Sequence, residues 1–212
     1  MVNVAQTSDI MATASEVVIL AGGEGNRLGS VFKPLVKICS KTLIEIVVEE
    51  LSKLGSDIYV IVHTPQQAIT LERQVGIKVK VLIDELHLKT PLAGLFTAST
   101  ALKGEILYIA PCDTPFLKHE TYLKLHREMT GVDAAIPLWP DGKIEPLIAV
   151  YRREKLKDAV TCALRHGEKS ARAPLKYLRV AYVPVEEVFE DPCKETININ
   201  TPNDLSEISA IC

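Results

Sequence analysis

Short apolar runs alternate along the chain with stretches in which apolar residues recur at helical spacing. The runs contain few polar residues, which is typical of strands that are buried on both faces of a sheet. They predict strands at residues 17–20, 58–62, 79–83 and 106–110, and a short extended piece at 35–38. The helical spacing predicts helices at residues 43–54, 66–74 and 92–102, the first of which ends before Gly55.

This alternation of strands and helices predicts a doubly wound α/β fold. Crossover helices connect parallel strands, so the sheet should be mostly parallel and covered by helices on both faces. Beyond about residue 130 the alternation of strands and helices becomes less regular. The pattern there predicts strands at 134–137, 147–151 and 179–183 and a helix at 153–164. We interpret residues 16–212 as one domain and residues 1–15, which show no clear period, as a flexible tail.

A glycine-rich turn follows the first predicted strand. Its sequence is Ala21-Gly22-Gly23-Glu24-Gly25-Asn26-Arg27-Leu28-Gly29, and Lys33 comes four residues later. Backbone N–H groups in such a turn are accessible to an anion, and Arg27 and Lys33 add positive charge. We therefore interpret this segment as a binding site for a polyphosphate.

The amino-acid sequence of this turn excludes two common phosphate-binding motifs. A P-loop requires Lys-Ser or Lys-Thr directly after its last glycine, and the turn has neither. A dinucleotide fingerprint counted from Gly23 requires a glycine where Leu28 stands and an acid near the end of the second strand, where His63 stands. The remaining alternative is a tight turn between a strand and a helix that binds no ligand.

A second candidate lies at the end of the strand at 106–110. Asp113 stands between Pro111 and Pro115, which restrict the backbone, and a carboxylate held there suits a Mg²⁺ ion beside a triphosphate. The same residue could instead cap a helix near His119 or form an Asx turn before Pro115. The spacing alone leaves both interpretations open.

Two further segments offer candidate side chains. Asn198 and Asn200 are two residues apart, so an extended backbone would direct both amides to one face. Their alternative role is to cap the last helix near Pro202, which Thr201 can also do. Asp84 follows the strand at 79–83, but an isolated aspartate at a strand end is more often a turn or cap residue.

Composition and charge narrow the range of functions. The chain has 212 residues, 47% hydrophobic, and a formal net charge of −3, which gives no general attraction to nucleic acid. No apolar run approaches about 18 residues and the N-terminus lacks a secretory pattern, so we expect no membrane association and a cytoplasmic protein. The five cysteines and five histidines are dispersed, which favours reduced thiols and oxygen ligands for any metal.

In combination these segments resemble the molybdenum cofactor guanylyltransferases, within the nucleotidyltransferase superfamily. The resemblance extends from Val17 to about Ile208. It rests on Leu20-Ala21-Gly22-Gly23 through Lys33 and on the blocks Pro91-Leu92-Ala93-Gly94-Leu95, Pro111-Cys112-Asp113-Thr114-Pro115, Glu145-Pro146-Leu147-Ile148-Ala149-Val150-Tyr151 and Asn198-Ile199-Asn200-Thr201-Pro202. The glycine turn is specific only to the superfamily, whereas the blocks in this order are much more specific.

The resemblance implies a Mg²⁺-dependent enzyme that transfers GMP from GTP to the terminal phosphate of molybdopterin or the molybdenum cofactor and releases pyrophosphate. It implies catalytic roles for Arg27, Lys33 and Asp113, with Asp113 as the Mg²⁺ ligand. The implied nucleotide-binding residues are Leu20, Ala21, Gly22, Gly23, Gly25, Lys33, His63, Asp84 and Asp113, and Asn198 and Asn200 would lie on the acceptor, or pterin, side. Proteins that deliver molybdopterin or accept the cofactor would be its partners.

Three positions depart from the pattern of this family. Phe32 stands where an acid usually precedes the loop lysine, Thr90 replaces a common glycine before Pro91, and His63 stands where asparagine is frequent. These departures concern the contacts to the base more than the phosphate site.

Other functions stay open at this stage. Residues 33–39, Lys-Pro-Leu-Val-Lys-Ile-Cys, are similar to the archaeal guanylyltransferase of cobamide (adenosylcobinamide phosphate) synthesis, which has no close counterpart to the blocks at 91–95 and 111–115. A cytidylyltransferase of related fold is a further alternative. A catalytically inactive sensor or scaffold that binds nucleotide is the non-enzyme alternative, and the presence of both Lys33 and Asp113 argues against it.

Overall fold

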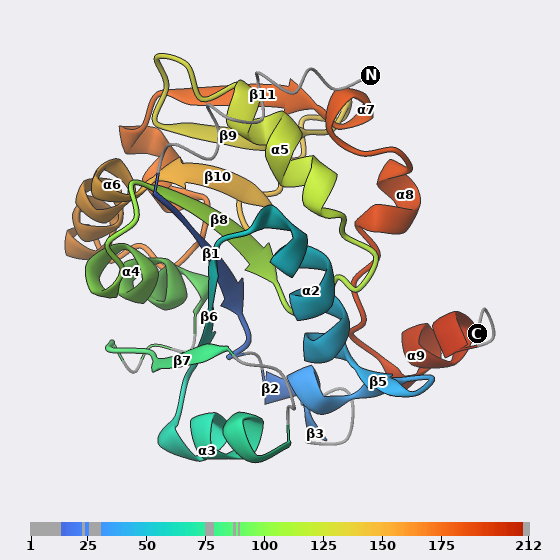
Figure 1. The fold of residues 1–212 in the computed structure, drawn as a ribbon. Helices are drawn as coiled ribbons and strands as arrows, with labels where there is room; N and C mark the ends of the chain where they lie inside the picture. The colour runs from blue at the N-terminus through green and yellow to red at the C-terminus, as the bar shows by residue number, and fades with distance from the viewer. Residues whose placement is uncertain are drawn as a thin grey trace.

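A seven-stranded sheet forms the centre of the molecule (Figure 1). The computed structural model describes residues 14–22, 24–25, 31–74, 79–86, 88 and 90–209. The strand order is β11-β9-β10-β8-β1-β6-β7. The strands are β1 (Ser15–Leu20), β6 (Asp57–Val62), β7 (Lys80–Ile83), β8 (Ile106–Pro111), β9 (Ala134–Leu138), β10 (Ala149–Arg152) and β11 (Val180–Pro184).

The sheet is mostly parallel, as the sequence predicts. β1 pairs in parallel with both β6 and β8, β6 pairs in parallel with β7, and β11 pairs in parallel with β9. β10 is the exception, because it runs antiparallel to β8 and to β9. The carboxyl ends of β1, β6, β7 and β8 therefore meet at one edge of the sheet, where ligands bind in open α/β folds.

Helices cover both faces of the sheet (Figure 1). Residues of α2, α3, α5 and α7 belong to the buried apolar cluster on one face, and residues of α4 and α6 belong to the cluster on the other. These helices are α2 (Leu43–Leu51), α3 (Pro65–Gln74), α4 (Pro91–Ala101), α5 (His119–Arg127), α6 (Arg153–Arg165) and α7 (Val185–Val188), followed by α8 (Pro192–Glu195) and α9 (Pro202–Ser209). The described residues also form three short 3₁₀ segments, η2 (Lys33–Leu35), η3 (Ser52–Leu54) and η4 (Ala173–Tyr177).

Local sequence signals explain where α2 begins and ends. The Thr42 hydroxyl accepts a hydrogen bond from the backbone N–H of Glu45, and the Glu45 carboxylate accepts one from the backbone N–H of Thr42. This capping box satisfies two backbone donors that a helix start leaves unpaired. The α-helix stops at Leu51 and continues as η3 up to Gly55, whose φ of 70° lies in the left-handed region that glycine adopts without strain.

The structure corrects some predicted elements. The extended piece expected at 35–38 is only Lys37–Ile38 (β4), because Leu35 belongs to η2, where Pro34 favours a helical turn. β4 pairs with β5 (Lys41–Thr42), and β2 (Glu24–Gly25) pairs with β3 (Val31–Phe32). The helices α7 and α8 are not predicted, since four residues are too short to show a helical period.

Two further expectations concern cysteines and membranes. Cys112, Cys162 and Cys193 are free thiols, as expected, but Cys39 is disulfide-bonded, so the expectation of reduced thiols is wrong there. Spacing along the sequence does not show which cysteines the fold brings together. Among the described residues, every helix is too short or too polar to cross a membrane.

Candidate active site

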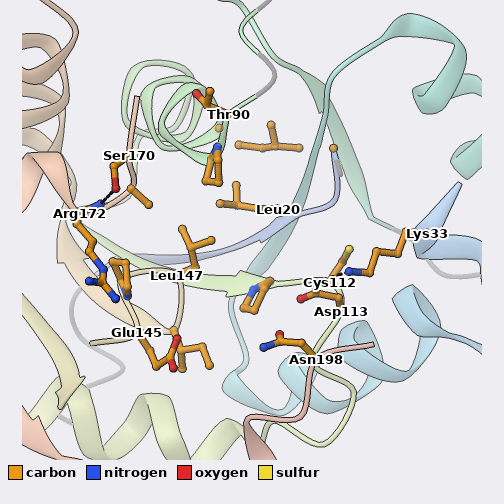
Figure 2. Close-up of a pocket in the computed structure, with 18 of the residues that line it drawn as sticks. Leu20, Lys33, Thr90, Cys112, Asp113, Glu145, Leu147, Ser170, Arg172 and Asn198 are labelled. Atoms are coloured by element: carbon orange, nitrogen blue, oxygen red, sulfur yellow. Dashed lines mark hydrogen bonds and ion pairs between the residues drawn. The ribbon is translucent and has the colours of Figure 1, made fainter. Parts of the chain in front are cut away.

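A cavity with a volume of about 650 Å³ opens at the carboxyl ends of the central strands, and it is called the principal cavity below because of this position (Figure 2). Leu20 and Gly22 line it at the end of β1, His63 after β6, and Cys112 and Asp113 after β8. The loop before α9 contributes Asn198 and Asn200, and η2 contributes Lys33. The structure thus brings together residues that the sequence places far apart.

Lys33 is the centre of the polar contacts in this cavity. Its Nζ donates a hydrogen bond to Asp113 Oδ2 at 2.6 Å and another to Asn200 Oδ1 at 2.8 Å. The Lys33 side chain is only 9% exposed and that of Asp113 is 23% exposed. A largely buried ammonium group needs such partners, because burial of an unpaired charge is costly.

The contacts of Asp113 do not support the capping interpretation. The N-cap residue of α5 is Lys118, and it makes no side-chain capping bond. Among the described residues, the Asp113 carboxylate accepts a hydrogen bond from Lys33 Nζ, and the hydroxyl of Thr114 lies 3.4 Å from its Oδ1. Asp113 therefore directs its charge into the cavity.

The segment before α9 alternates between the core and the cavity. Ile199 is fully buried, whereas Asn198 and Asn200 on either side of it line the cavity. The Ile199 N–H donates to the backbone oxygen of Asp113 at 2.9 Å, and the Thr114 hydroxyl donates to Asn198 Oδ1 at 2.8 Å. Both asparagines thus face one side, which agrees with the expectation from their spacing.

The start of α9 is capped without either asparagine side chain. Thr201 Oγ1 accepts a hydrogen bond from the N–H of Asp204 at 3.2 Å. In return the Asp204 carboxylate accepts from the N–H groups of Asn200 and Thr201, each at 2.8 Å. This leaves the side-chain amide of Asn200 available for Lys33.

Asp84 and His63 form a second polar group in the cavity wall. His63 Nδ1 lies 3.1 Å from Asp84 Oδ2, and the Thr97 hydroxyl donates to Asp84 Oδ1 at 3.0 Å. The Asp84 side chain is completely buried, while that of His63 is 19% exposed. Gly22 packs directly against the His63 ring, because a Cβ built on Gly22 would lie 2.6 Å from ring atoms Cδ2 and Nε2.

The beginning of α4 forms the adjacent wall. A Cβ at Gly94 would lie 2.8 Å from Leu20 Cδ2, so glycine lets this helix approach the end of β1 closely. Thr90, just before Pro91, has a buried hydroxyl that makes no hydrogen bond within the part of the chain that is described. Thr90 and Pro91 both line the cavity.

The opposite end of the cavity contains side chains that sequence reasoning did not single out. Lys143 and Glu145 line it from the loop between β9 and β10, and Ser170 and Arg172 line it from the segment after α6 (Figure 2). Lys143 Nζ is paired with Glu145 Oε1 at 2.8 Å. Glu145 carries part of the family resemblance, but neither spacing nor periodicity assigns a role to these loop residues.

Comparison with known proteins agrees with this architecture. The model of the MobA-like NTP transferase domain matches residues 17–182. The chain belongs to the MobA-like NTP transferase family. It is therefore a nucleotidyltransferase, and the resemblance seen in the sequence is confirmed.

Individual members of this family resemble the chain over most of its length. A probable molybdenum cofactor guanylyltransferase of Bacillus licheniformis is 32% identical, covering 90% of this chain and 94% of the relative. A probable molybdenum cofactor guanylyltransferase of Methanosarcina mazei is 30% identical over 90% of this chain and 88% of its own length. The crystal structure of molybdopterin-guanine dinucleotide biosynthesis protein A from Archaeoglobus fulgidus superposes with a TM-score of 0.79 at 31% identity, covering 93% of this chain and 98% of that chain.

More distant structures share the fold of this family member. The 4-diphosphocytidyl-2C-methyl-D-erythritol synthase of Anaerococcus prevotii superposes with a TM-score of 0.69 but is only 14% identical, over 94% of this chain and 98% of that chain. At this identity the likeness concerns the fold alone.

Four residues implied by the resemblance are not among the described residues that line the cavity. Ala21 is fully buried, and its N–H donates to the backbone oxygen of Ile61 at 2.8 Å. Gly25 is described only as part of β2. Gly23 and Arg27 lie outside the described residues, so their expected roles stay predictions.

The surroundings of Cys112 do not favour a nucleophilic thiolate. It is buried in the cavity wall next to Asp113, and both burial and the neighbouring carboxylate raise the pKa of its thiol far above the usual value. The thiolate, which is the reactive form of cysteine, is therefore not populated near neutral pH.

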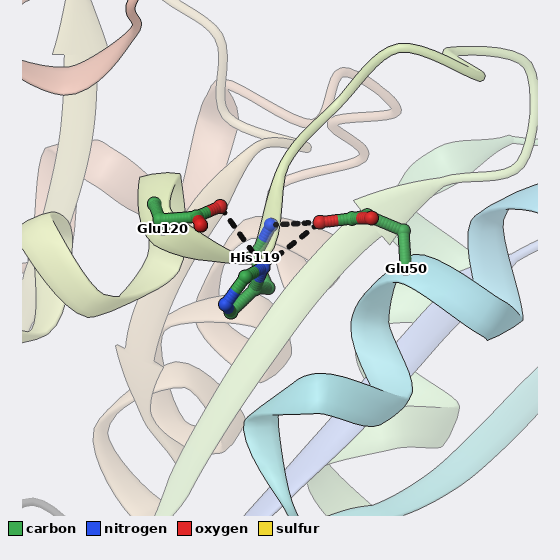
Figure 3. Close-up of side chains that lie close together, drawn as sticks. All are labelled: Glu50, His119 and Glu120. Atoms are coloured by element: carbon green, nitrogen blue, oxygen red, sulfur yellow. Dashed lines mark hydrogen bonds and ion pairs between the residues drawn. The ribbon is translucent and has the colours of Figure 1, made fainter.

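A separate group of titratable side chains ties α2 to α5 (Figure 3). His119 Nδ1 lies 2.8 Å from Glu50 Oε1 and 2.9 Å from Glu120 Oε2, and Glu50 also accepts from the backbone N–H of His119. Burial works to raise the pKa of Glu50, but hydrogen bonds from Lys53 and His119 outweigh it and lower the pKa. These contacts connect two helices, which explains why the three side chains lie together, and we assign no ligand to them.

Proposed function

We propose that this nucleotidyltransferase transfers GMP from GTP to the terminal phosphate of molybdopterin, or of its molybdenum-containing form, and releases pyrophosphate. The observation that carries the proposal is the contact of Lys33 with Asp113 and Asn200 in the principal cavity. These residues bring a cation, a carboxylate and an amide together in a chain about 30% identical to named guanylyltransferases. The proposed location is the cytoplasm, where GTP is available.

The reaction needs positioning and charge neutralisation more than it needs a base. A terminal phosphate oxygen of the acceptor attacks the α-phosphorus of GTP, and the bond from that phosphorus to the bridging oxygen of the β-phosphate breaks. A phosphate monoester is largely doubly ionised at neutral pH, since its second pKa is about 6. It attacks without giving up a proton, and catalysis depends on holding two anions together.

Lys33 supplies the positive charge closest to the proposed phosphate site. Its ammonium can turn from Asp113 toward the triphosphate, where a charge-assisted hydrogen bond is strong. Gly22 lines the cavity with backbone atoms alone, so the nucleotide can approach the chain closely there. Arg27 is the second proposed cation.

The oxygen atoms around Lys33 suit a magnesium ion. Asp113 Oδ2 and Asn200 Oδ1 both lie within hydrogen-bond distance of one cationic nitrogen, so the site already accommodates positive charge. Carboxylate and amide oxygens, completed by phosphate oxygens and water, match the ligands that Mg²⁺ accepts. We assign Asp113 as the protein ligand; when bound, Mg²⁺ would offset the charge of the triphosphate.

The two ends of the cavity correspond to the two substrates. His63 and Asp84 follow β6 and β7, whereas Lys143 and Arg172 come from loops on the side of β10. The nucleoside would occupy the β6 side, and the acceptor would approach from the other side past Asn198 and Asn200. Proteins that deliver molybdopterin or accept the product would be partners on that side.

Pyrophosphate release tests this function against its alternatives. Purified enzyme is incubated with Mg²⁺, with GTP, CTP or ATP, and with either molybdopterin or adenosylcobinamide phosphate. Pyrophosphate formed only from GTP plus molybdopterin supports the proposal. Preference for adenosylcobinamide phosphate or for CTP would assign one of the other transferase functions, and nucleotide binding without turnover would indicate a sensor or scaffold.

A further inference from the structure

Positive charge is concentrated in one stretch of the chain. Residues 152–179 contain nine Lys or Arg and only three Asp or Glu, which gives this stretch a net charge of +6. The whole chain carries −3, so the rest of it carries −9. The stretch runs from the end of β10 through α6 and η4 to the residue before β11. Charge separated in this way creates a local positive potential on a protein that is otherwise acidic.

Part of this charge serves the fold where β8 and β9 begin. Arg152 Nη1 pairs with Glu105 Oε1 at 2.9 Å, and Arg179 Nη2 pairs with Asp133 Oδ1 at 3.1 Å. Arg152 stands opposite the first residue of β8, and Asp133 directly precedes β9. These cations have acidic partners within the chain, so they leave little charge for a ligand.

The cations at the carboxyl end of α6 differ in this respect. No carboxylate of the described residues lies within ion-pair distance of Arg165, Lys169 or Arg172, and all three are exposed. Glu168, the acid in this segment, is paired with Lys176 through both of its oxygens, at 2.8 and 3.0 Å. The helix dipole favours Arg165 in the last turn of α6, but Lys169 and Arg172 lie beyond the helix, where the dipole does not explain them.

An exposed pair of rings lies among these cations. The His166 and Tyr177 rings stack with their centroids 6.2 Å apart and an angle of 22° between their planes. Tyr177 is 42% exposed, so the rings connect α6 to η4 without belonging to the core. Tyrosine and arginine are residue types that protein interfaces favour. We call this region the basic surface, and its residues are Arg165, His166, Lys169, Arg172, Lys176 and Tyr177.

The basic surface begins at the principal cavity and extends away from it. Ser170 and Arg172 line the acceptor end of the cavity (Figure 2). Arg165, His166 and Tyr177 are not among the described residues that line it. A small acceptor inside the cavity would not cover these outer side chains. A protein placed over the mouth of the cavity would contact them and the acceptor together.

The distribution of charge indicates the kind of partner. A long nucleic acid would also meet the remainder of the chain, whose charge of −9 repels it. A second copy of the chain could offer Glu186 and Glu187, which are exposed on α7. That contact would join two different surfaces, and such contacts continue into rings or filaments instead of closing a dimer. A separate folded protein with a local acidic surface meets neither obstacle.

We propose that the basic surface is the docking site for a protein that presents the acceptor to the cavity through an acidic surface of its own. This inference rests on the proposed function, because that function assigns the acceptor to this end of the cavity. Charges at the rim of an interface act mainly on the rate of association. The basic surface should therefore speed transfer to an acceptor held by a protein and leave transfer to the free acceptor unchanged.

Guanylyl transfer to two forms of the acceptor tests this docking. One form is free molybdopterin, and the other is molybdopterin still bound to the protein that forms it, purified from the same organism. In Arg165→Glu/Lys169→Glu, kcat/KM with the protein-bound acceptor should fall about tenfold or more, while transfer to free molybdopterin keeps the wild-type rate. An equal fall with both forms would mean that the surface attracts the small anion alone and would overturn the proposal. Unchanged rates with both forms would overturn it as well.

Arg127→Glu/Lys103→Glu is the matched control. Arg127 lies in the last turn of α5, as Arg165 does in α6. Lys103 follows the end of α4, as Lys169 follows α6. Both control residues are exposed, and the net charge changes by the same amount. The control should use the protein-bound acceptor as wild type does, and a fall as large as in the basic-surface variant would contradict a docking site at this place.

Thiol labelling locates the contact without any turnover. Cys162 Sγ lies 3.9 Å from His166 Nδ1 beside the basic surface, and Cys193 is an exposed thiol on α8. Wild type is treated with iodoacetamide, with and without the molybdopterin-forming protein, and both cysteines are followed by peptide mass spectrometry. Labelling of Cys162 should slow several-fold when that protein is present, and labelling of Cys193 should not change. Equal labelling of Cys162 in both mixtures would reject the docking site.

The outcomes separate this inference from the proposed function. If wild type transfers no GMP to free molybdopterin, the proposed function fails and the inference fails with it. Transfer to free molybdopterin without protection of Cys162 would leave the function standing and reject the docking site. Equal protection of Cys162 by a single-stranded DNA oligonucleotide would assign the surface to nucleic acid instead. Self-association of wild type in sedimentation, lost in Arg165→Glu/Lys169→Glu, would assign it to a second copy, and either result would overturn the proposed partner.

Discussion

Replacement of Asp113 by asparagine separates charge from shape at the proposed metal ligand. Asp113→Asn keeps the size of the side chain and an oxygen that can accept from Lys33 Nζ, now 2.6 Å from the carboxylate. It removes one negative charge that would face Mg²⁺. Two unit charges about 4 Å apart interact by about 4 kcal/mol at an effective dielectric constant of about 20. Since about 1.4 kcal/mol is a factor of ten, guanylyl transfer should fall by about a thousandfold.

The stability of Asp113→Asn should change much less than its activity. Asp113 is 23% exposed, and Lys33 keeps its hydrogen bond to Asn200 at 2.8 Å. We expect a loss of about 1 to 2 kcal/mol, as for a weakened charge-assisted hydrogen bond. In a chain of this size that corresponds to a melting temperature lower by about 2 to 8 °C.

The assay measures guanylyl transfer across a Mg²⁺ titration beside the melting temperature. High Mg²⁺ should partly restore the rate of Asp113→Asn, since weakened binding is offset by concentration. Asp158→Asn, at an exposed position of α6, is the matched control and should behave as wild type. A near-wild-type rate of Asp113→Asn at low Mg²⁺ would refute the metal assignment.

Three further substitutions test other parts of the structure. Lys33→Ala should lower guanylyl transfer about a hundredfold or more through loss of a cation at the phosphates, and retained turnover in steady-state assays would reject that role. Gly22→Ala should raise KM for GTP several-fold, because its methyl group would lie 2.6 Å from the His63 ring; an unchanged KM would contradict this contact. Hydrogen bonds from Arg179 lower the pKa of Asp133, so this pair stabilises the fold above pH ~4 and the contribution is lost as pH falls further. The free energy of unfolding of Asp133→Asn, measured by chemical denaturation, should therefore fall less between neutral and acid pH than that of wild type. An identical pH dependence in the two proteins would contradict a stabilising role of the Asp133–Arg179 pair.

The sequence predicts the central part of the fold well for a physical reason. β1, β6 and β8 are flanked by neighbours, so their apolar runs are uninterrupted and easy to recognise. The rule that ligands bind at the carboxyl ends of such strands then brings the loop after β1 near Asp113. The alternation of Asn198, buried Ile199 and Asn200 likewise follows from local chain geometry.

Other features depend on contacts that no local pattern contains. β10 runs antiparallel between β8 and β9, although Ala149, Val150 and Tyr151 are as buried as the residues of a parallel strand. Asp84 has its hydrogen-bond partners in His63, which follows the neighbouring strand β6, and in Thr97 on α4. The cavity residues Lys143 and Arg172 are exposed and lie in loops, where composition carries no structural period.

Apolar packing far from the reacting phosphates also shapes the proposed active site. Ile199 belongs to a small buried cluster with Val36 and Leu43, and its N–H donates to the backbone oxygen of Asp113. These contacts hold the chain on both sides of Ile199 against the fold and place Asn200 beside Lys33. Lys33 itself belongs to η2, directly before Val36, so both partners of this hydrogen bond are anchored in the same apolar cluster. Lys33, Asp113 and Asn200 are thus all held in place by the same apolar cluster, and a substitution that loosens this cluster would displace all three side chains together.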